Sequence, residues 1–296
     1  MKHLRKLVAT ALVPVVVFGA LAVMNPALAE GEEEAPAYGW KNGFLGGFRL
    51  TQAGFSNWAA GGENSLAWQL TMTGRFLYDQ EAYDWSNWFK LGYGMAKQGD
   101  QDSRKSVDEI KLESVISAAL SGRLSAYASL YWETQFARGY TYTDTDRTAI
   151  SNFMDPGYFT ESAGLSYKYW ADWTTRLGFA AKQTLADEFR AFSDDPDTGD
   201  EEEALRAEYG AEWVTDFGYE ISEKLVYLTK INFFSNMKGF DEIDVRWDNS
   251  LAAAVAPYVD VTFDYNLLYD RDVTKTVQMR DALAIGLVFK VGTEVE

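Results

Sequence analysis

The sequence predicts an all-β protein, a 12-stranded antiparallel transmembrane β-barrel with short periplasmic turns and longer extracellular loops. Three observations support this fold class. Apolar and polar side chains alternate along about a dozen segments, the chain opens with an export signal, and the connections are alternately short and long. Because neighbouring side chains of a strand point to opposite faces, each segment has one apolar and one polar face. Apolar outside and polar inside is the pattern of an outer-membrane barrel.

The N-terminus has the features of a secretory signal peptide. Three basic residues precede an apolar stretch at 7–23, and Ala27 and Ala29 supply an A-x-A cleavage site. We therefore expect a signal peptide at 1–29, a short periplasmic N-terminal segment at 30–42 and the outer-membrane β-barrel at 43–296.

The alternation is clearest at 65–78, where Leu66 and Leu70 lie on one face and Gln69 and Thr71 on the other. The same period of two recurs along the chain and predicts twelve strands. In chain order they are 43–52, 65–78, 83–98, 108–120, 124–136, 159–169, 173–185, 206–215, 224–235, 245–255, 259–269 and 279–291.

The connections support an even number of strands. Bacterial barrels have short turns on the periplasmic side and longer loops outside, with both chain ends inside. Twelve strands place both chain ends and every short turn on one side. The short connections are 79–82, 121–123, 170–172, 217–223 and 256–257; the longer ones are 53–64, 98–107, 137–157, 186–205, 236–242 and 270–275.

Aromatic residues gather beside the short turns, among them Tyr78, Trp85, Tyr169 and Trp173. Rings with an apolar body and a polar tip form girdles at lipid headgroups, so this placement favours a membrane barrel. A soluble β-sandwich also alternates but needs no such girdle. A lipocalin-like soluble barrel reverses the two faces, and the sequence alone does not say which face is inside.

Composition excludes several classes of function. The chain contains no cysteine, which removes disulfides and thiolate chemistry. Its single histidine, His3, lies in the signal peptide, so the histidine base of barrel phospholipases and proteases is missing and we expect no enzyme. A net charge of −17 disfavours nucleic acid as a partner. We expect no cofactor and no metal, because the acidic run at 194–203 lacks the spacing of a calcium loop.

The predicted inward faces carry charges of both signs in nearly equal number, although the whole chain is acidic. Such charges either pair across strands and close the interior, or line a water-filled path that selects polar or anionic solutes. Twelve strands lie between the filled eight-stranded barrel and the open porin, so strand number does not decide. The candidate lumen-lining residues are Arg75, Lys90, Lys111, Glu113, Glu133, Arg176, Lys182, Arg206, Glu212, Lys230, Arg246, Asp260 and Asp264.

The first long loop holds the most distinctive motif of the chain, N-W-A-A-G-G-E-N-S. The glycine pair allows a sharp reversal, which would let the tryptophan enter the barrel mouth or pack on the rim. The motif resembles the signature of an uncharacterised family of bacterial outer-membrane β-barrels, a domain of unknown function. The stretches at 85–94 and 104–108 are similar to that family too. The resemblance implies fold and location but no activity. The signature residues are Asn57, Trp58, Gly61, Gly62, Glu63 and Asn64.

Together these features predict a narrow passive channel for small polar or anionic solutes in the outer membrane of a Gram-negative bacterium. The alternative is a non-conducting barrel with a structural or partner-binding role. Expected partners are outer-membrane lipid and lipopolysaccharide, small solutes and the barrel-assembly machinery. The stretch at 284–291 looks like the C-terminal signal that this machinery reads, although five residues follow it.

Overall fold

The computed structural model describes residues 38–57, 59–143, 146–170, 172–195, 198–199, 202–237, 243–271 and 274–292. The predicted signal peptide and most of the predicted N-terminal segment lie outside these ranges. In the residues that are described, no helix is long and apolar enough to cross a membrane.

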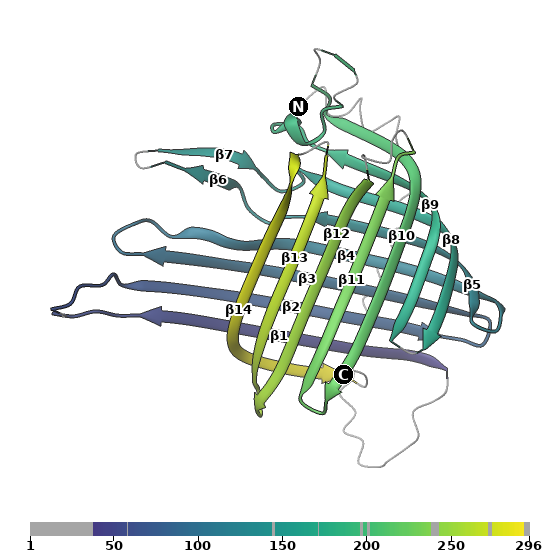
Figure 1. The fold of residues 1–296 in the computed structure, drawn as a ribbon, viewed down its shortest axis with the longest axis horizontal. Helices are drawn as coiled ribbons and strands as arrows, with labels where there is room; N and C mark the ends of the chain where they lie inside the picture. Colours follow the sequence, from purple (N-terminus) through teal and green to yellow (C-terminus); the bar gives the residue numbers. More distant parts are fainter. Residues whose placement is uncertain are drawn as a thin grey trace. The chain divides into compact units, whose positions relative to one another are not determined.

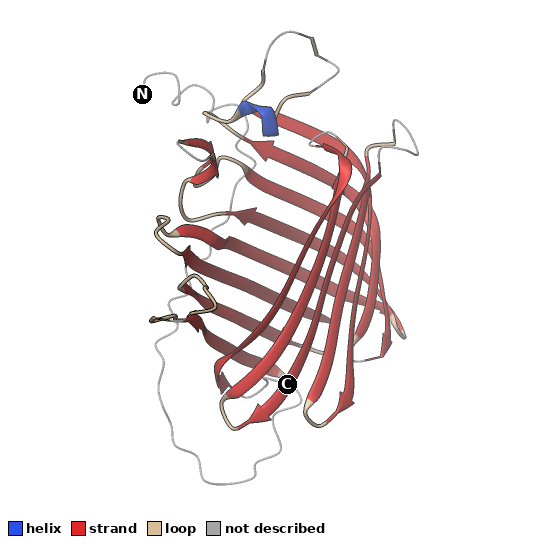
Figure 2. Cartoon of the chain, turned by 60° about the vertical axis from the view of Figure 1, so that its left-hand side comes forward, coloured by secondary structure: helices blue, strands red, loops and turns tan. Residues whose placement is uncertain are grey.

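The described strands form a closed antiparallel barrel of twelve strands, as the alternation predicted (Figures 1 and 2). Each strand pairs with its neighbours in sequence, except that β5 pairs with β8 and β1 pairs with β14 to close the sheet. The barrel strands are β1 (Gly39–Ala53), β2 (Ser65–Asp79), β3 (Tyr83–Gln98), β4 (Arg104–Ser121), β5 (Leu124–Thr134), β8 (Gly157–Trp170), β9 (Trp173–Leu185), β10 (Leu205–Ser222), β11 (Leu225–Ser235), β12 (Ile243–Ala256), β13 (Val259–Asp270) and β14 (Thr274–Gly292).

The long connection between β5 and β8 contains a hairpin that the sequence did not predict. Its strands β6 (Gly139–Tyr142) and β7 (Arg147–Ser151) form a separate two-stranded sheet. Figure 1 shows this hairpin beside the long-loop ends of the strands. The next long connection contains one short 3-10 turn, η1 (Arg190–Phe192).

Some strands are longer than the alternation indicated. β1 begins at Gly39 because Trp40 continues the apolar face and pairs with Tyr78 of β2. The predicted short connection at 217–223 is wrong, since β10 continues to Ser222 and pairs with β11 along that stretch. The aromatic rings of Phe217 and Tyr219 stack 6.2 Å apart on the outer face, which stabilises this extension.

The two faces of the wall differ sharply in chemistry. Large apolar side chains are exposed on the outside, including Leu283 at 74% and Phe179 at 60%. Charged side chains are buried inside, including Arg206 at 4% and Glu212 at 5%. A protein surrounded by water does not expose an apolar surface of this extent, whereas lipid requires it. The wall is therefore that of a membrane-embedded barrel, and the soluble sandwich and lipocalin-like alternatives do not describe it.

The predicted aromatic girdle forms at the short-turn end of the barrel. Trp40 lies 5.0 Å from Tyr78, and Trp173 lies 4.3 Å from Tyr169 and 4.6 Å from Trp170, measured between ring centroids. These contacts join neighbouring strands on the outer surface. They mark the level at which the wall would meet the lipid headgroups.

Candidate functional site: the barrel interior

A first cluster of ion pairs joins strands that are far apart around the wall. Glu113 of β4 accepts a hydrogen bond from Arg176 Nη2 of β9 at 2.7 Å and pairs with Lys230 Nζ of β11. Asp216 of β10 lies 3.3 Å from Arg176 and 3.5 Å from Lys230. Because β5, β8, β9 and β10 separate β4 from β11 in the sheet, the Lys230–Glu113 pair must cross the interior.

A second cluster lies closer to the long-loop end. Arg246 of β12 donates from Nη2 to Glu133 Oε1 of β5 at 3.0 Å and from Nε to Asp248 at 3.1 Å. Lys111 of β4 lies 3.2 Å from Glu109, which also pairs with Lys90 of β3 at 2.9 Å. The cluster therefore connects β3, β4, β5 and β12 through the interior.

A third cluster lies at the long-loop ends of β9, β10, β12 and β13. Lys182 Nζ donates to Asp244 Oδ2 at 2.5 Å and to Asp270 Oδ2 at 2.8 Å. Glu208 lies 3.8 Å from Lys182 and 3.3 Å from Arg206. Together the three clusters join strands from β3 to β13 across the interior.

The ring of Tyr127 packs beside Arg176 of the first cluster. Tyr127 of β5 is opposite Gly164 of β8, which is opposite Gly178 of β9, so a row without side chains lies beside the ring. An added Cβ at Gly178 would lie 2.6 Å from the Tyr127 hydroxyl oxygen. The guanidinium carbon of Arg176 lies 5.7 Å from the Tyr127 ring centroid, within reach of a cation–π interaction.

The opposite side of the interior is lined by small side chains. The inward faces of β1, β2, β3 and β14 there carry mainly glycine, alanine and threonine, and we call this surface the small-residue strip. Arg75 of β2 stands beside it, exposed and without an ion pair to any residue that the structure describes. Most of the strip is half-buried, and the side chains of Arg49 and Glu109 lie against Gly286 and Gly92. Its defining residues are Gly47, Thr71, Thr73, Gly92, Ala284 and Gly286.

The structure brings nine of the thirteen predicted lumen residues into the three clusters: Lys90, Lys111, Glu113, Glu133, Arg176, Lys182, Arg206, Lys230 and Arg246. The other four lie elsewhere. Glu212 accepts a hydrogen bond from Asn232 Nδ2 at 2.6 Å, and Asp264 accepts one from Ser250 Oγ at 2.7 Å. Asp260, on β13 opposite Gly286, and Arg75 form no ion pair with a described residue.

Two acidic members of the clusters were missed from the sequence. Asp216 lies one residue beyond the predicted end of its strand, and Asp270 was assigned to a loop. Both continue the alternation of β10 and β13 and lie on their inward faces. Extending the alternation by one residue would have found them.

The signature loop is held by its own polar groups. The backbone N–H of Phe55 donates to Asn64 Oδ1 at 2.7 Å, and Gln98 Nε2 donates to Glu63 Oε2 at 3.2 Å. Gly62 has a φ of 144° and leaves room for the Phe55 ring, which an added Cβ would approach to 2.5 Å. Asn57 and Gly61 also have positive φ, whereas Trp58 lies outside the described residues. These contacts support a packing role for the motif.

The acidic loop after η1 contains two carboxyl groups with opposite shifts. Loss of solvation raises the pKa of Asp194, and the neighbouring carboxylate of Glu203 raises it further. The pKa of Glu203 is lowered, first by the hydrogen bond that its side chain accepts from the Thr198 hydroxyl. Among the residues that the structure describes, no group of acidic or histidine side chains is arranged to hold a metal ion.

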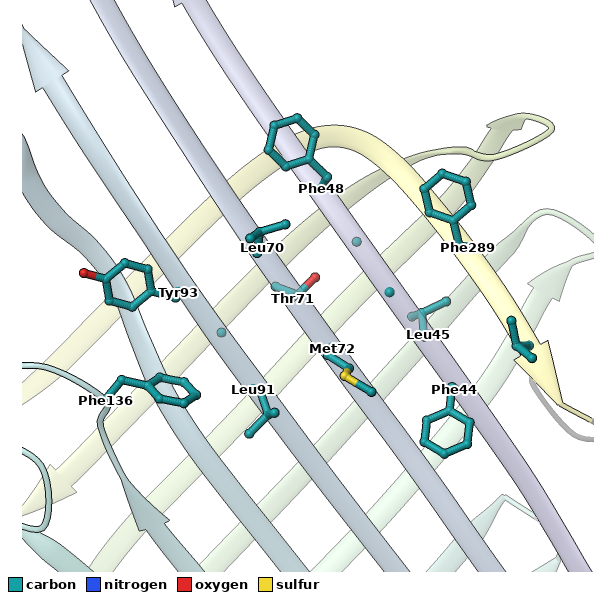
Figure 3. Close-up of a pocket in the computed structure, with 14 residues that line it drawn as sticks. Phe44, Leu45, Phe48, Leu70, Thr71, Met72, Leu91, Tyr93, Phe136 and Phe289 are labelled. Atoms are coloured by element: carbon teal, nitrogen blue, oxygen red, sulfur yellow. The ribbon is translucent and has the colours of Figure 1, made fainter. Parts of the chain in front are cut away.

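One hollow lies on the outer face of the barrel. It measures about 610 Å³ and lies over Gly46 and Gly47, between the outward rings of Phe44, Phe48 and Phe289 (Figure 3). Its lining is almost wholly apolar, as expected for an outer face in contact with lipid. The hollow forms where Gly46 has no side chain to fill it. A smaller cavity of about 280 Å³, lined by both charged and apolar residues, lies inside, against β4, β5 and the long-loop halves of β12, β13 and β14.

The model of the family described as "Protein of unknown function (DUF3078)" matches residues 50–140, which include the signature loop. This confirms the resemblance to a family of unknown function. No curated protein matches the sequence.

Three solved structures illustrate what the barrel is similar to. The COG4313 outer membrane channel from Pseudomonas putida F1 shares 10% identity at a TM-score of 0.39, covering 90% of this chain and 100% of that one. The translocator domain of autotransporter NalP from Neisseria meningitidis shares 10% at 0.33, covering 84% and 86%. The outer membrane channel DcaP of Acinetobacter baumannii shares 9% at 0.29, covering 86% and 96%.

Proposed function

We propose that the protein is a narrow passive channel of the Gram-negative outer membrane for small polar solutes, with a preference for anions. The observation that carries the proposal is the small-residue strip. Its side chains are small and most of them are half-buried, whereas ion pairs cross the rest of the interior. A solute path would therefore run off-centre, along the strip.

The preference for anions follows from the charges near this path. Arg75 is exposed and has no carboxylate partner among the described residues, and Lys290 of β14 is exposed in the same way. These two cations outnumber Asp260, the carboxylate opposite Gly286 that forms no ion pair with a described residue. Cations inside a pore raise the local concentration of anions and oppose the entry of cations. Lipid and lipopolysaccharide would cover the outer wall, and the barrel-assembly machinery would insert the chain.

Planar bilayer recording tests this function. The purified barrel should give discrete conductance steps, with a reversal potential in a KCl gradient that shows anion preference. Arg75→Gln should move that reversal potential towards zero, because it removes an unpaired cation from the path.

A matched pair of tryptophan variants locates the path. Thr71 points inward from the strip, and the next residue, Leu70, points outward and is 52% exposed. Thr71→Trp should reduce the conductance several-fold, whereas Leu70→Trp should leave it unchanged. Equal conductance of the two variants would show that the path does not follow the strip.

One observation favours a second candidate, the non-conducting barrel with a structural or partner-binding role. The pairs Arg246–Glu133 and Lys230–Glu113 each join walls that are not neighbours, so they brace the interior and narrow it. The absence of conductance steps from well-folded protein would support this candidate and reject the channel.

A further inference from the structure

The pairing of β1 with β14 closes the barrel, and we call it the seam. The two strands are paired over only part of their length. β1 pairs with β2 over all of Gly39–Ala53, but with β14 only from Gly43 to Arg49. β14 pairs with β13 over its first part, up to Leu287, and with β1 only from Gly286 to Gly292. On the long-loop side of the Arg49–Gly286 pair, residues 50–53 of β1 and 274–285 of β14 are therefore not paired with each other.

Exposure of the side chains shows that the two strand edges diverge there. Residues 275–281 of β14 are exposed on both faces, a longer exposed run than in any other described barrel strand, and residues 50–53 of β1 are exposed as well. Figure 1 shows the upper part of β14 following β13, away from the long-loop end of β1. An opening in the wall at this place would lead from the lipid to the interior.

Arg49 marks the lower limit of the opening. Its side chain passes over Gly286, where an added Cβ would lie 2.6 Å from Arg49 Cγ, and its Nη2 donates to Thr262 Oγ1 of β13 at 2.6 Å. This contact ties β1, β14 and β13 together at the last paired position. The inner cavity of about 280 Å³ lies directly inside the unpaired part of β14.

The chemistry of that cavity suggests what enters. Leu268 is an apolar side chain on its lining and is 39% exposed, whereas Met279, opposite Leu267, lies on the outward face of β14 at the same place and is 67% exposed. Four carboxylates also line the cavity, and each is already paired with a lysine or an arginine: Asp108 with Lys105, Glu109 with Lys90 and Lys111, and Glu133 and Asp248 with Arg246. Arg280 lies on the same lining, is exposed and forms no hydrogen bond or ion pair with the described residues. An apolar side chain next to the one charge on this lining that has no ion pair with a described residue fits an apolar chain with an anionic head.

We propose that the gap between β1 and β14 above Arg49–Gly286 is a lateral portal, through which amphipathic anions pass from the membrane into the lumen. This inference rests on the proposed function only for its membrane setting. The two fail separately, because conductance in a bilayer and access of lipid chains to the lumen are measured independently.

Cysteine cross-linking tests the geometry, and the chain has no native cysteine to interfere. If the β1–β14 register continued past Arg49, Thr51 would lie opposite Ala284. Leu45 and Lys290 are directly opposite each other in the part of the seam that is paired, and their side chains also face inward. A disulfide needs Cα atoms within about 7 Å. Under mild oxidation, Leu45→Cys with Lys290→Cys should cross-link fully, and Thr51→Cys with Ala284→Cys should not. Equal cross-linking of the two pairs would overturn the portal.

Lipid access is tested with a fluorophore on a single cysteine, in nanodiscs that contain dibrominated phosphatidylcholine. Ala284→Cys places the label on the inward face at the gap. Ala96→Cys places it on the inward face of β3, opposite Ala67 and at the height of Thr51, in a fully paired wall. The bromines should quench the label at 284 several-fold more than the label at 96. Equal, weak quenching at both positions would overturn the portal.

The anionic head is tested with 9,10-dibromostearate and its methyl ester as quenchers of the label at 284. Arg280→Gln should raise the half-quenching concentration of the acid several-fold and leave that of the ester unchanged. Arg123→Gln removes an exposed cation from a short turn at the other end of the barrel and should change neither. If Arg280→Gln has no effect on the acid, the assignment of an anionic ligand is wrong.

Discussion

Gly178 and Tyr127 show how single residues shape the interior. A tyrosine on one strand occupies the space that two glycines leave on the next two strands, and an arginine packs over the ring. Packing an aromatic ring against a glycine in a neighbouring strand restores the contact area that the glycine lacks. The ring then fixes the height and direction of Arg176, and through it the first ion-pair cluster.

The first prediction concerns this row. Gly178→Ala should lower the free energy of unfolding by about 1–3 kcal/mol, because its Cβ would lie 2.4 Å from the carbonyl oxygen of Ala163 and would displace Tyr127. Urea unfolding in lipid vesicles, followed by tryptophan fluorescence, measures it. Gly46→Ala is the control, since its Cβ would meet nothing within 4 Å. Equal stability of the two variants would contradict the packing argument.

The second prediction concerns Glu113, the carboxylate that two cations share. Glu113→Gln should destabilise the barrel by about 3 kcal/mol, because Arg176 and Lys230 would keep their charges in a confined interior with Asp216 alone to balance them. The matched control is Glu188→Gln, which breaks the exposed pair with Arg138 and should cost less than about 1 kcal/mol. The same unfolding assay compares them, and a larger loss at Glu188 would refute the assignment.

At the scale of strands, alternation predicted the number, order and facing of the barrel elements because lipid and lumen demand opposite chemistry on the two faces. It missed β6 and β7, whose few residues are too short for a period of two to be distinguished from a loop. It ended β10 early, since Gly218 and the charged residues after it resemble a turn. A contact with β11 decided that boundary, and no local pattern records such a contact.

The third prediction concerns the seam between β1 and β14. Gly286→Ala should weaken it, because the added Cβ would lie 2.6 Å from Arg49 Cγ and 2.7 Å from the Phe48 carbonyl oxygen. The temperature at which the folded band disappears from an unboiled denaturing gel should fall by several degrees. Gly46→Ala, on β1 but facing outward into open space, should leave that temperature unchanged. A fall of the same size in both variants would show that the seam is not the sensitive element.

For the whole molecule, the sequence revealed which charges face inward but not which of them meet. The alternation along a strand shows which face of the sheet a side chain occupies. It does not show that Lys230 of β11 pairs with Glu113, because that contact depends on the curvature that brings β4 opposite β11. For the same reason the three clusters, the small-residue strip and the gap in the seam were all beyond sequence reasoning. The sequence did predict that the positive and negative charges of the interior are nearly equal in number, and that the excess negative charge lies in the loops.

The fourth prediction tests the membrane setting of the whole wall. Phe179 lies at the middle of β9 and faces outward, and Ile221 faces outward at the short-turn end of β10. In lipid vesicles, Phe179→Arg should cost about 2–4 kcal/mol of folding free energy and Ile221→Arg about 0–1 kcal/mol, because the penalty for a charge depends on its depth in the bilayer. Unfolding in urea measures both. Equal costs would argue against a lipid-facing wall.

The short seam also has a consequence for how the barrel folds. Every other strand pair in the barrel joins consecutive strands or strands linked by one hairpin, but the β1–β14 pair joins the two ends of the barrel sequence through seven residue pairs. Contacts between distant parts of a chain carry the largest loop-closure entropy and form slowly. The final step of folding is therefore the one with the fewest hydrogen bonds to drive it. Until it is complete, the growing sheet has two free edges, which makes this interval the one in which the chain is most prone to aggregate.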